Sequence, residues 1–173
     1  MSYFFKIMPS PVGDLTLIAS DKGLAAVLWE NENPKRVRQM APEENPTHPV
    51  LLETERQLIE YFAGNRTQFT MTLDFVGTEF QKKVWEALVA IPFGETRSYS
   101  EIARQIGHPA AVRAVGAANG KNPISIIAPC HRVIGANGKL TGFAGGLAAK
   151  ALLLKIEAMK QSQLLFTLEQ DAV

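Results

Sequence analysis

Apolar residues at the start of the chain come in three short runs, YFFKIM, DLTLIAS and LAAVLW. The segments PSPVG and SDKG, which lie between these runs, are rich in residues that favour turns. Runs of this length, separated by turns, predict an antiparallel β-meander over residues 1–30. The polar stretch 31–49 contains four prolines, and it predicts a loop with at most a short helix.

The next apolar residues recur with the period of an α-helix. The segment VLLETERQLIEYF, residues 50–62, predicts an amphipathic helix that ends at Gly64 and Asn65. Residues 65–77 then predict a linker that contains one strand, at about 69–75.

Three helices with clear start and stop signals follow. Thr78 with Gln81, and Ser98 with Glu101, have the spacing of capping boxes, which begin the first two of these helices. The second helix, YSEIARQIG, ends at Gly107, and the third, AAVRAVGAANG, follows a Gly-His-Pro turn. Two short helices joined so tightly have the spacing of a helix-turn-helix, although any αα-hairpin would show the same pattern.

The third helix has almost no large side chains, and Arg113 is its only long one. Small residues are typical of closely packed helices, but a narrow helix with one projecting arginine could also lie against a nucleic-acid groove. Beyond it the pattern predicts a strand, ISIIA, a hairpin turn at Asn137 and Gly138, a flexible loop at 142–146 and a last helix, LAAKALLLKIEAMK.

The chain has 173 residues, enough for one compact unit or for two small domains. The change from strands to helices indicates two. We expect residues 1–70 to form a small antiparallel sheet with one helix, 71–77 to be a linker, and 78–173 to form a mainly helical domain with a helix-turn-helix and a short hairpin. The predicted fold class is therefore α/β, of the α+β kind.

Composition narrows the class of protein further. Hydrophobic residues make up 46% of the chain and charged residues 20%, which is typical of a globular protein. No apolar run approaches the roughly 20 residues that span a bilayer, and the amino terminus lacks the long apolar region of a secretory signal. The single cysteine excludes an internal disulfide, which fits a reducing compartment. We expect a cytoplasmic protein with no membrane association.

Positive charge is concentrated in residues 97–139. The whole chain has a net charge of +1. This segment has one acidic residue, Glu101, against six basic ones: Arg97, Arg104, Arg113, Lys121, Arg132 and Lys139. Such a segment is either a solvated face or a surface that faces the phosphates of a nucleic acid.

The only cysteine, Cys130, lies in the stretch IIAPCHRVIG, beside His131. A free thiol is mostly protonated at neutral pH, so an imidazole that accepts its proton would activate it as a nucleophile. Neighbouring residues of a strand point to opposite faces, however. Either the strand breaks at this point or a water bridges the sulfur and the ring. A carboxylate would also be needed to orient the ring, and Glu157 on the last helix is a candidate.

Five separated motifs carry a family resemblance. PCHRVIG, preceded by RAVGAANGKNPIS and followed by TGFAGGLAAK, resembles the O6-alkylguanine-DNA alkyltransferases, or methylated-DNA–protein-cysteine methyltransferases, of the bacterial type. The resemblance runs from about Phe75 to Glu157 and includes Trp85, IPFGETRSYSEIA and the helix-turn-helix. It implies a ribonuclease H-like first domain, which matches only in length and pattern, and a winged-helix-like second domain.

The resemblance implies a direct-reversal DNA repair enzyme that is consumed in its reaction. Cys130 would take the alkyl group from O6 of guanine by in-line displacement at carbon, and each molecule would act once. His131 would draw off the thiol proton through a bridging water, and Glu157 would orient the imidazole. Asn122 would brace the active-site turn.

The damaged base lies inside a duplex, so it must be flipped out. The resemblance places the small-residue helix in the minor groove, with Arg113 filling the vacated place in the stack. Tyr99 would rotate the 3′ phosphate and donate its hydroxyl to N3 of guanine. The residues expected to contact DNA are Tyr99, Ser100, Arg113, Ala114, Gly116 and Ala117.

The resemblance also implies a base pocket. The backbone carbonyls of Cys130 and Val133 would accept from the guanine amine, the backbone N–H of Ala144 would donate to O6, and Phe143 would line the pocket. Some relatives have serine at position 144. Because the implied contact comes from the backbone N–H, alanine at this position keeps the contact and changes only the width of the pocket.

The expected partner is double-stranded DNA that carries O6-alkylguanine or O4-alkylthymine, bound by a monomer without a cofactor. We expect no metal, because the histidines are scattered and the zinc that some relatives hold in the first domain needs further cysteines.

Two other classes of function are open to a protein with this sequence. A non-catalytic sensor of alkylated DNA, as in the alkyltransferase-like proteins, would lack the cysteine that is present here. A cysteine hydrolase would need a histidine remote from Cys130 in the sequence, and only His48 and His108 are available.

Overall fold

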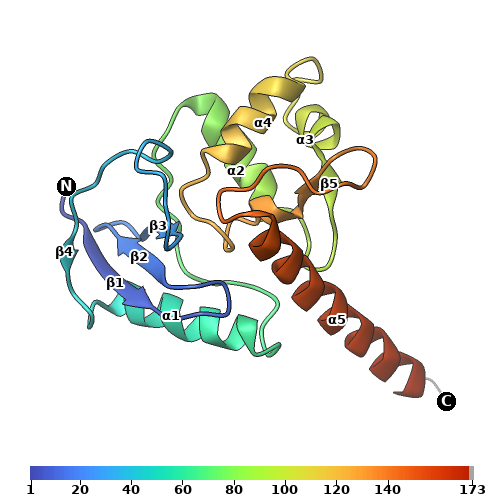
Figure 1. Ribbon diagram of the computed structural model, residues 1–173, viewed down its shortest axis with the longest axis horizontal. Coiled ribbons are helices and arrows are strands. Elements are labelled where there is room, and N and C mark those ends of the chain that lie inside the picture. Colours follow the sequence, from blue (N-terminus) through green and yellow to red (C-terminus); the bar gives the residue numbers. More distant parts are fainter. Residues whose placement is uncertain (172–173) are drawn as a thin grey trace.

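The computed structural model describes residues 1–171, and Figure 1 shows a sheet with one helix against it beside a mainly helical half. Four strands form the sheet, in the order β3-β2-β1-β4. They are β1 (Phe4–Met8), β2 (Leu15–Ala19), β3 (Leu24–Leu28) and β4 (Glu43–Glu44). The pairs β1–β2 and β2–β3 are antiparallel. The predicted β-meander is therefore confirmed.

The predictions of a wholly antiparallel sheet and of a strandless stretch 31–49 are wrong. The short strand β4 pairs with β1 in parallel. The backbone N–H of Glu43 donates to the carbonyl of Tyr3, and that of Asn45 donates to the carbonyl of Phe5. An edge strand has unpaired backbone groups, and this polar segment satisfies those of β1.

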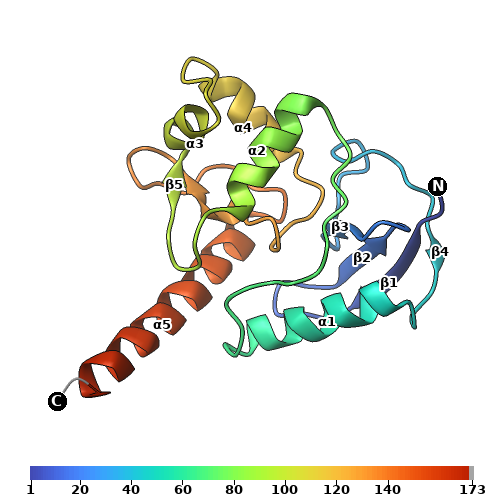
Figure 2. The same ribbon diagram turned by 180° about the vertical axis from the view of Figure 1, so that it is seen from behind.

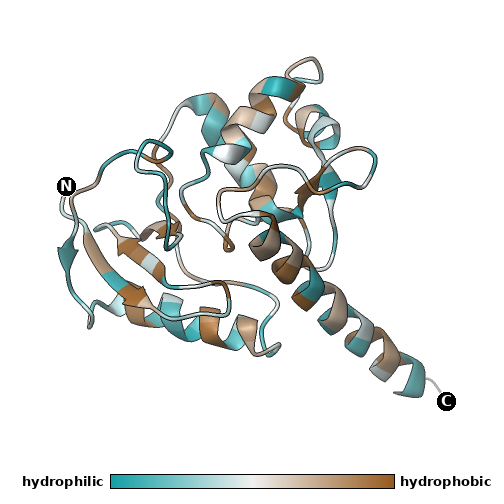
Figure 3. Cartoon of the chain, viewed as in Figure 1, coloured by the Kyte–Doolittle hydropathy of each residue, from teal (hydrophilic) through white to brown (hydrophobic). Residues whose placement is uncertain are grey.

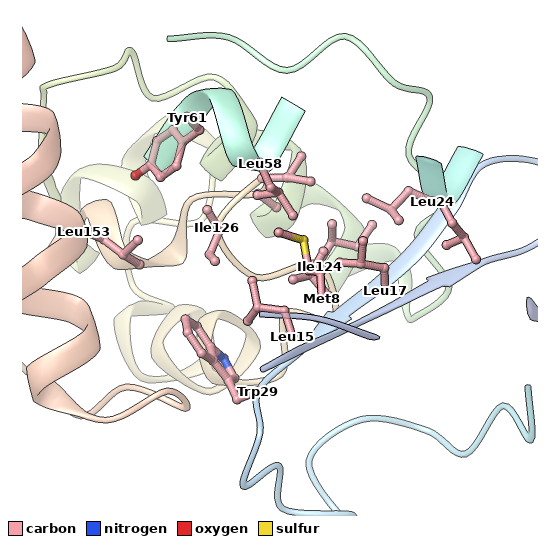
Figure 4. Close-up of a cluster of buried hydrophobic side chains, with 14 of the residues drawn as sticks. Met8, Leu15, Leu17, Leu24, Trp29, Leu58, Tyr61, Ile124, Ile126 and Leu153 are labelled. Atoms are coloured by element: carbon pink, nitrogen blue, oxygen red, sulfur yellow. The ribbon is translucent and has the colours of Figure 1, made fainter. Parts of the chain in front are cut away.

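Helix α1 (Pro49–Phe62) lies along one face of the sheet. In Figure 3 apolar and polar segments alternate along this helix, as expected for an amphipathic element. The buried side chains Leu58 and Tyr61 point into a core that the sheet fills with Met8, Leu15 and other residues (Figure 4). The amphipathic helix predicted for 50–62 is confirmed, and it begins one residue earlier.

The strand predicted at about 69–75 does not form. Only Leu73 makes a bridge, to Leu24, while the backbone groups of Thr72 and Asp74 bond to the same residue of β3. The linker therefore follows β3 for one residue and moves away before a strand can form.

The second half of the structure begins with α2 (Glu79–Val89), β5 (Arg97–Ser98), α3 (Tyr99–Gln105) and α4 (Val112–Gly120). Both predicted capping boxes are present, at the starts of α2 and α3. Helix α4 begins at Val112, later than predicted, because the residues after the Gly-His-Pro turn form a second turn. The indole of Trp85 donates to the carbonyl of Ala118 at 2.9 Å, which fixes α4 on α2.

The apolar segment 124–128, predicted as a strand, is a buried loop. Ile124 makes one bridge to Val27, and Ile126 has a φ of 73°, which a strand cannot contain. The side chain of Asn122 hydrogen-bonds to the backbone at both ends of this segment, to the N–H of Ile124 and the carbonyl of Ala128. Burial explains the run of apolar residues, which sequence periodicity alone cannot distinguish from a strand.

The chain continues through a 3₁₀ turn, η1 (Cys130–Arg132), a short strand, β6 (Val133–Ile134), and a long helix, α5 (Leu147–Asp171). The turn predicted at Asn137 and Gly138 forms: the N–H of Gly138 donates to the carbonyl of Gly135, and the N–H of Gly135 donates to the carbonyl of Lys139. Residues 139–146 form no strand that would complete a hairpin. The strand β6 pairs instead with β5, in parallel.

Helix α5 is longer than predicted, and its outer half extends away from the rest of the molecule (Figures 1 and 2). The last two residues of the second predicted domain, 172–173, lie outside the described residues. Within residues 1–171, no helix is long and apolar enough to cross a membrane.

The first-domain sheet supports the loop that precedes Cys130. Ile124, Ile126 and Ile127 belong to the same buried cluster as residues of β1 and β2. The indole of Trp29, at the end of β3, donates to the hydroxyl of Ser125 at 3.1 Å. The position of the cysteine therefore depends on both halves of the chain.

Candidate active site

The loop that leads to Cys130 is held by the side chain of Asn122, which is fully buried. Its amide nitrogen donates to the carbonyl of Ala128 at 2.8 Å, and its amide oxygen accepts from the N–H of Ile124 at 3.0 Å. Arg36, from the first domain, donates to the carbonyl of Asn122 at 2.7 Å. These bonds fit the bracing role that the family resemblance implies for Asn122, and no feature of the sequence indicated that Arg36 takes part.

Cys130 begins the 3₁₀ turn, so the chain is not extended there. The rule that neighbouring side chains of a strand point to opposite faces therefore does not apply to Cys130 and His131. The thiol is buried, with 4% of the residue exposed. Burial raises its pKa, and the Asn122 amide with the charges of Arg36 and Lys150 offsets only part of this effect. The thiol is therefore protonated at neutral pH, and it needs a base before it can act as a nucleophile.

His131 is fully buried and pairs with Glu157 of α5, with 2.7 Å between Nε2 and Oε2. Burial lowers the pKa of His131, and the hydrogen bond and charge of Glu157 oppose this effect. The ring is therefore neutral at pH 7. Because a carboxylate can only accept, Nε2 carries the proton and Nδ1 has a free lone pair. Within residues 1–171, Nδ1 has no hydrogen-bond partner.

Glu157 has two further partners that sequence reasoning missed. Arg132 donates from Nε to Oε1 at 2.7 Å and from Nη2 to Oε2 at 3.1 Å, and the hydroxyl of Tyr61 donates to Oε2 at 2.6 Å. Burial raises the pKa of Glu157, but the contacts with His131 and Arg132 more than offset it and hold the pKa at about 2. Glu157 is therefore ionised under all ordinary conditions.

Arg132 is buried and does not belong to the basic surface that residues 97–139 could form. Only 6% of this residue is exposed, and one of its guanidinium nitrogens donates to the carbonyl of Ile91 at 2.7 Å. Arg132 therefore cannot face the phosphates of a nucleic acid, although the sequence count grouped it with Arg113. No local feature of the sequence indicates that its partner is Glu157, 25 residues further along the chain.

Lys150 is a second buried cation that the sequence did not indicate. Its ammonium donates to the carbonyl of Val133 at 2.7 Å and lies 5.8 Å from the ring centroid of Phe143. Burial lowers its pKa, while the charge of the nearby Cys130 thiolate would raise it. The carbonyl of Val133, a predicted base contact, thus already accepts from a buried ammonium.

The helix-turn-helix presents one accessible face. On α4, Arg113, Ala114 and Ala117 are exposed and Gly116 is half-buried, whereas Val115 and Ala118 are buried in the same cluster as α2. Besides Arg113, the exposed residues of α4 are therefore all small.

Tyr99 and Ser100 begin α3 and are half-buried. The ring of Tyr99 lies next to Gly116, where a β-carbon would be 3.8 Å from it. The hydroxyl of Tyr99 bonds to that of Thr141 at 2.6 Å. Phe143 is half-buried and Ala144 exposed in the loop that follows Thr141. The structure therefore brings together two groups of predicted residues, one around Cys130 and one on the face of α3 and α4.

The two remote histidines do not contact the cysteine. His48 caps α1, where its Nδ1 accepts from the N–H of Val50 at 3.2 Å. The ring of His108 lies against Phe80, at 5.8 Å between centroids. The hydrolase alternative therefore lacks its base. In the part of the chain that the structure describes, no group of three or more His, Cys, Asp or Glu side chains could hold a metal ion.

Comparisons with known proteins match both halves of the chain. Residues 3–75 match the ribonuclease-like domain of 6-O-methylguanine DNA methyltransferase, and residues 79–159 match the DNA-binding domain of the same family. The methylated-DNA–protein-cysteine methyltransferase of Mycobacterium leprae is 49% identical over 87% of this chain and 89% of its own length. The methylated-DNA–protein-cysteine methyltransferase of Methanosarcina acetivorans is 51% identical over 89% of this chain and 97% of its own length.

A solved structure agrees with these relatives. The crystal structure of Mycobacterium tuberculosis OGT in complex with DNA is 46% identical and covers 92% of this chain and 94% of its own, with a TM-score of 0.83. The chain belongs to the methylated-DNA–protein-cysteine methyltransferase family. The predicted fold class, a ribonuclease-like sheet with a helix followed by a helical DNA-binding domain, is confirmed.

Proposed function

We propose that this protein, a methylated-DNA–protein-cysteine methyltransferase, repairs O6-methylguanine in DNA by moving the methyl group irreversibly to Cys130. The observation that carries the proposal is the buried Cys130 next to His131, whose Nε2 is bonded to the ionised Glu157 and whose Nδ1 is free. A neutral imidazole in this state is a proton acceptor, which a buried, protonated thiol requires.

The chemical step is an in-line displacement. The proton of the Cys130 thiol passes through a bridging water to Nδ1 of His131, and the sulfur then attacks the methyl carbon. The bond between that carbon and O6 of guanine breaks, and its electron pair stays with the base. The imidazolium is stabilised by Glu157 at 2.7 Å. The thioether product has no route back to a thiol, so each molecule reacts once.

The leaving base needs neutralisation as negative charge develops on it. The hydroxyl of Tyr99 donates to N3 of guanine and can at the same time accept from the hydroxyl of Thr141, which lies 2.6 Å from it. The carbonyls of Cys130 and Val133 accept from the guanine amine, the N–H of Ala144 donates to O6, and Phe143 lines the pocket. A pocket of this kind accepts O4-alkylthymine as well.

DNA binds to the face of α3 and α4, with α4 in the minor groove. The small exposed residues Ala114, Gly116 and Ala117 allow the helix to approach the groove closely. Arg113 projects from this face and fills the gap that the flipped base leaves, while Tyr99 and Ser100 contact the backbone beside it. The protein acts as a monomer, and we assign residues 1–70 and 78–173 to separate domains joined by 71–77, a division that the two matched ranges support.

The stoichiometry of repair tests this proposal. With duplex O6-methylguanine in several-fold excess, we expect guanine to be restored in a single phase that stops at one equivalent per protein molecule, because the acceptor is not regenerated. Separation of the oligonucleotide and quantification of the two bases measures the endpoint. Continued turnover beyond one equivalent would exclude a consumed acceptor, and no restoration of guanine would exclude the activity.

A further inference from the structure

Tyr61 connects the first domain to the pair that activates the thiol. It lies in the last turns of α1, 96 residues before Glu157 in the sequence, and its hydroxyl is 2.6 Å from Oε2 of that glutamate. The same oxygen is 2.7 Å from Nε2 of His131. In Figure 4 the hydroxyl of Tyr61 points away from the sheet, toward the helix that carries Leu153 and therefore Glu157.

The ring of Tyr61 is held firmly, with 1% of the residue exposed. It packs against Phe62, Phe69 and Phe93, with centroid distances of 5.3, 5.5 and 6.4 Å. Burial and the charge of Glu157 raise the pKa of the phenol. The hydroxyl is therefore a permanent donor, and the carboxylate is its acceptor.

A phenylalanine would fill this site equally well, because the packing partners of the ring are apolar or aromatic. The hydroxyl is therefore not needed for packing, and its contribution is the hydrogen bond to Glu157. A buried donor that bonds a carboxylate both fixes the carboxylate and withdraws negative charge from the oxygen that it reaches.

We propose that Tyr61 is a positioning residue of the methyl-transfer reaction: its hydroxyl fixes the Glu157 carboxylate and tunes the basicity of His131 from the first domain. This inference rests on the proposed roles of Cys130, His131 and Glu157. The first domain is then a part of the reaction machinery as well as a support for the DNA-binding half.

The effect on pH dependence has a definite sign. The groups that face His131 and Glu157 are Cys130 and Arg132 on the same turn, Lys150 on α5, and Tyr61 on α1. Loss of the Tyr61 hydroxyl leaves more negative charge on Oε2, which stabilises the imidazolium and raises the pKa of His131. Because the ring must be neutral to accept the thiol proton, the acid limb of the rate profile moves to higher pH.

The variant Tyr61→Phe tests the inference. We expect the single-turnover rate of methyl transfer to fall about threefold to tenfold on its plateau, the size of one typical hydrogen bond, because a carboxylate without this bond orients the imidazole less well. We also expect the acid limb to move to higher pH. The loss should be equal on duplex DNA and on the free O6-methylguanine base, since activation of the thiol is common to both.

Tyr3→Phe is the matched control. Tyr3 is a buried tyrosine of the same domain, and its hydroxyl bonds to Arg38, away from the active site. Its rate and pH profile should equal those of the wild type, while thermal unfolding reports the stability of each variant. A Tyr61→Phe profile that coincides with that of Tyr3→Phe would overturn the inference, as would a slower rate with an unshifted acid limb. Failure of the wild type itself to accept a methyl group would instead reject the proposed function.

Discussion

Cys130→Ser is expected to abolish methyl transfer while DNA binding stays close to that of the wild type. A serine hydroxyl is far less acidic than a thiol and is a weaker nucleophile toward saturated carbon, so His131 cannot activate it. The residue lies in the 3₁₀ turn rather than on the exposed face of α4. Removal of the sulfur therefore leaves the DNA-facing surface intact.

The rate of guanine restoration and the affinity for an O6-methylguanine duplex measure the two parts of this prediction. Thermal unfolding shows whether the variant is folded, because a hydroxyl at a buried site with 4% exposure carries a cost in stability. Cys130→Ala, which introduces no new polar group, serves as the matched control. If either variant restored guanine at a rate near that of the wild type, Cys130 would be a packing residue and not the acceptor.

Arg113→Ala is expected to slow repair of duplex DNA far more than reaction with the free O6-methylguanine base. The free base needs no flipping, whereas a base in a duplex must leave the stack at a cost of a few kcal/mol. If the side chain of Arg113 fills the gap, its loss raises that cost. The defect should shrink when the damaged base is mispaired or single-stranded. Alanine keeps the helix propensity of α4 high, so a folding defect would not produce this pattern.

The matched control for this variant is Arg104→Ala. Arg104 is also exposed, in the last turn of α3 rather than on the α4 face proposed to enter the groove, so we expect it to act as a phosphate contact. Its loss should weaken binding alike on all DNA and reduce the salt slope by about one unit. At saturating duplex the rate of Arg104→Ala should recover, whereas that of Arg113→Ala should not. Equal losses for Arg113→Ala on free base and duplex would contradict the gap-filling role.

Local signals in the sequence predicted those elements that local contacts stabilise. The capping boxes at Thr78 and Ser98 predict the starts of α2 and α3 because each is closed within four residues. The β-meander has the same character, since its strands are joined by short turns. The loop 124–128 did not follow its local pattern, because its shape is set by the Asn122 side chain and by packing on a sheet from the other half of the chain.

The residues of the candidate site also divide into those that the sequence indicated and those that only the folded structure shows. His131 and Glu157 were nominated from the sequence, and the structure brings them within 2.7 Å of each other. Tyr61 and Arg132 were missed, since neither carries a local signal of its partner. A buried tyrosine needs an acceptor, but only the folded structure, which brings the hydroxyl of Tyr61 within 2.6 Å of Oε2 of Glu157, shows which acceptor it has. Arg132 looked like part of a basic surface until its burial was known.

Mass spectrometry of the protein after reaction tests the central claim most directly. After incubation with a duplex that contains O6-methylguanine, we expect the intact mass to rise by one methylene, about 14 Da. Fragmentation should place this gain on Cys130 alone, in every molecule that has reacted. An unchanged mass after guanine has been restored, or a methyl group on any other residue, would contradict the account.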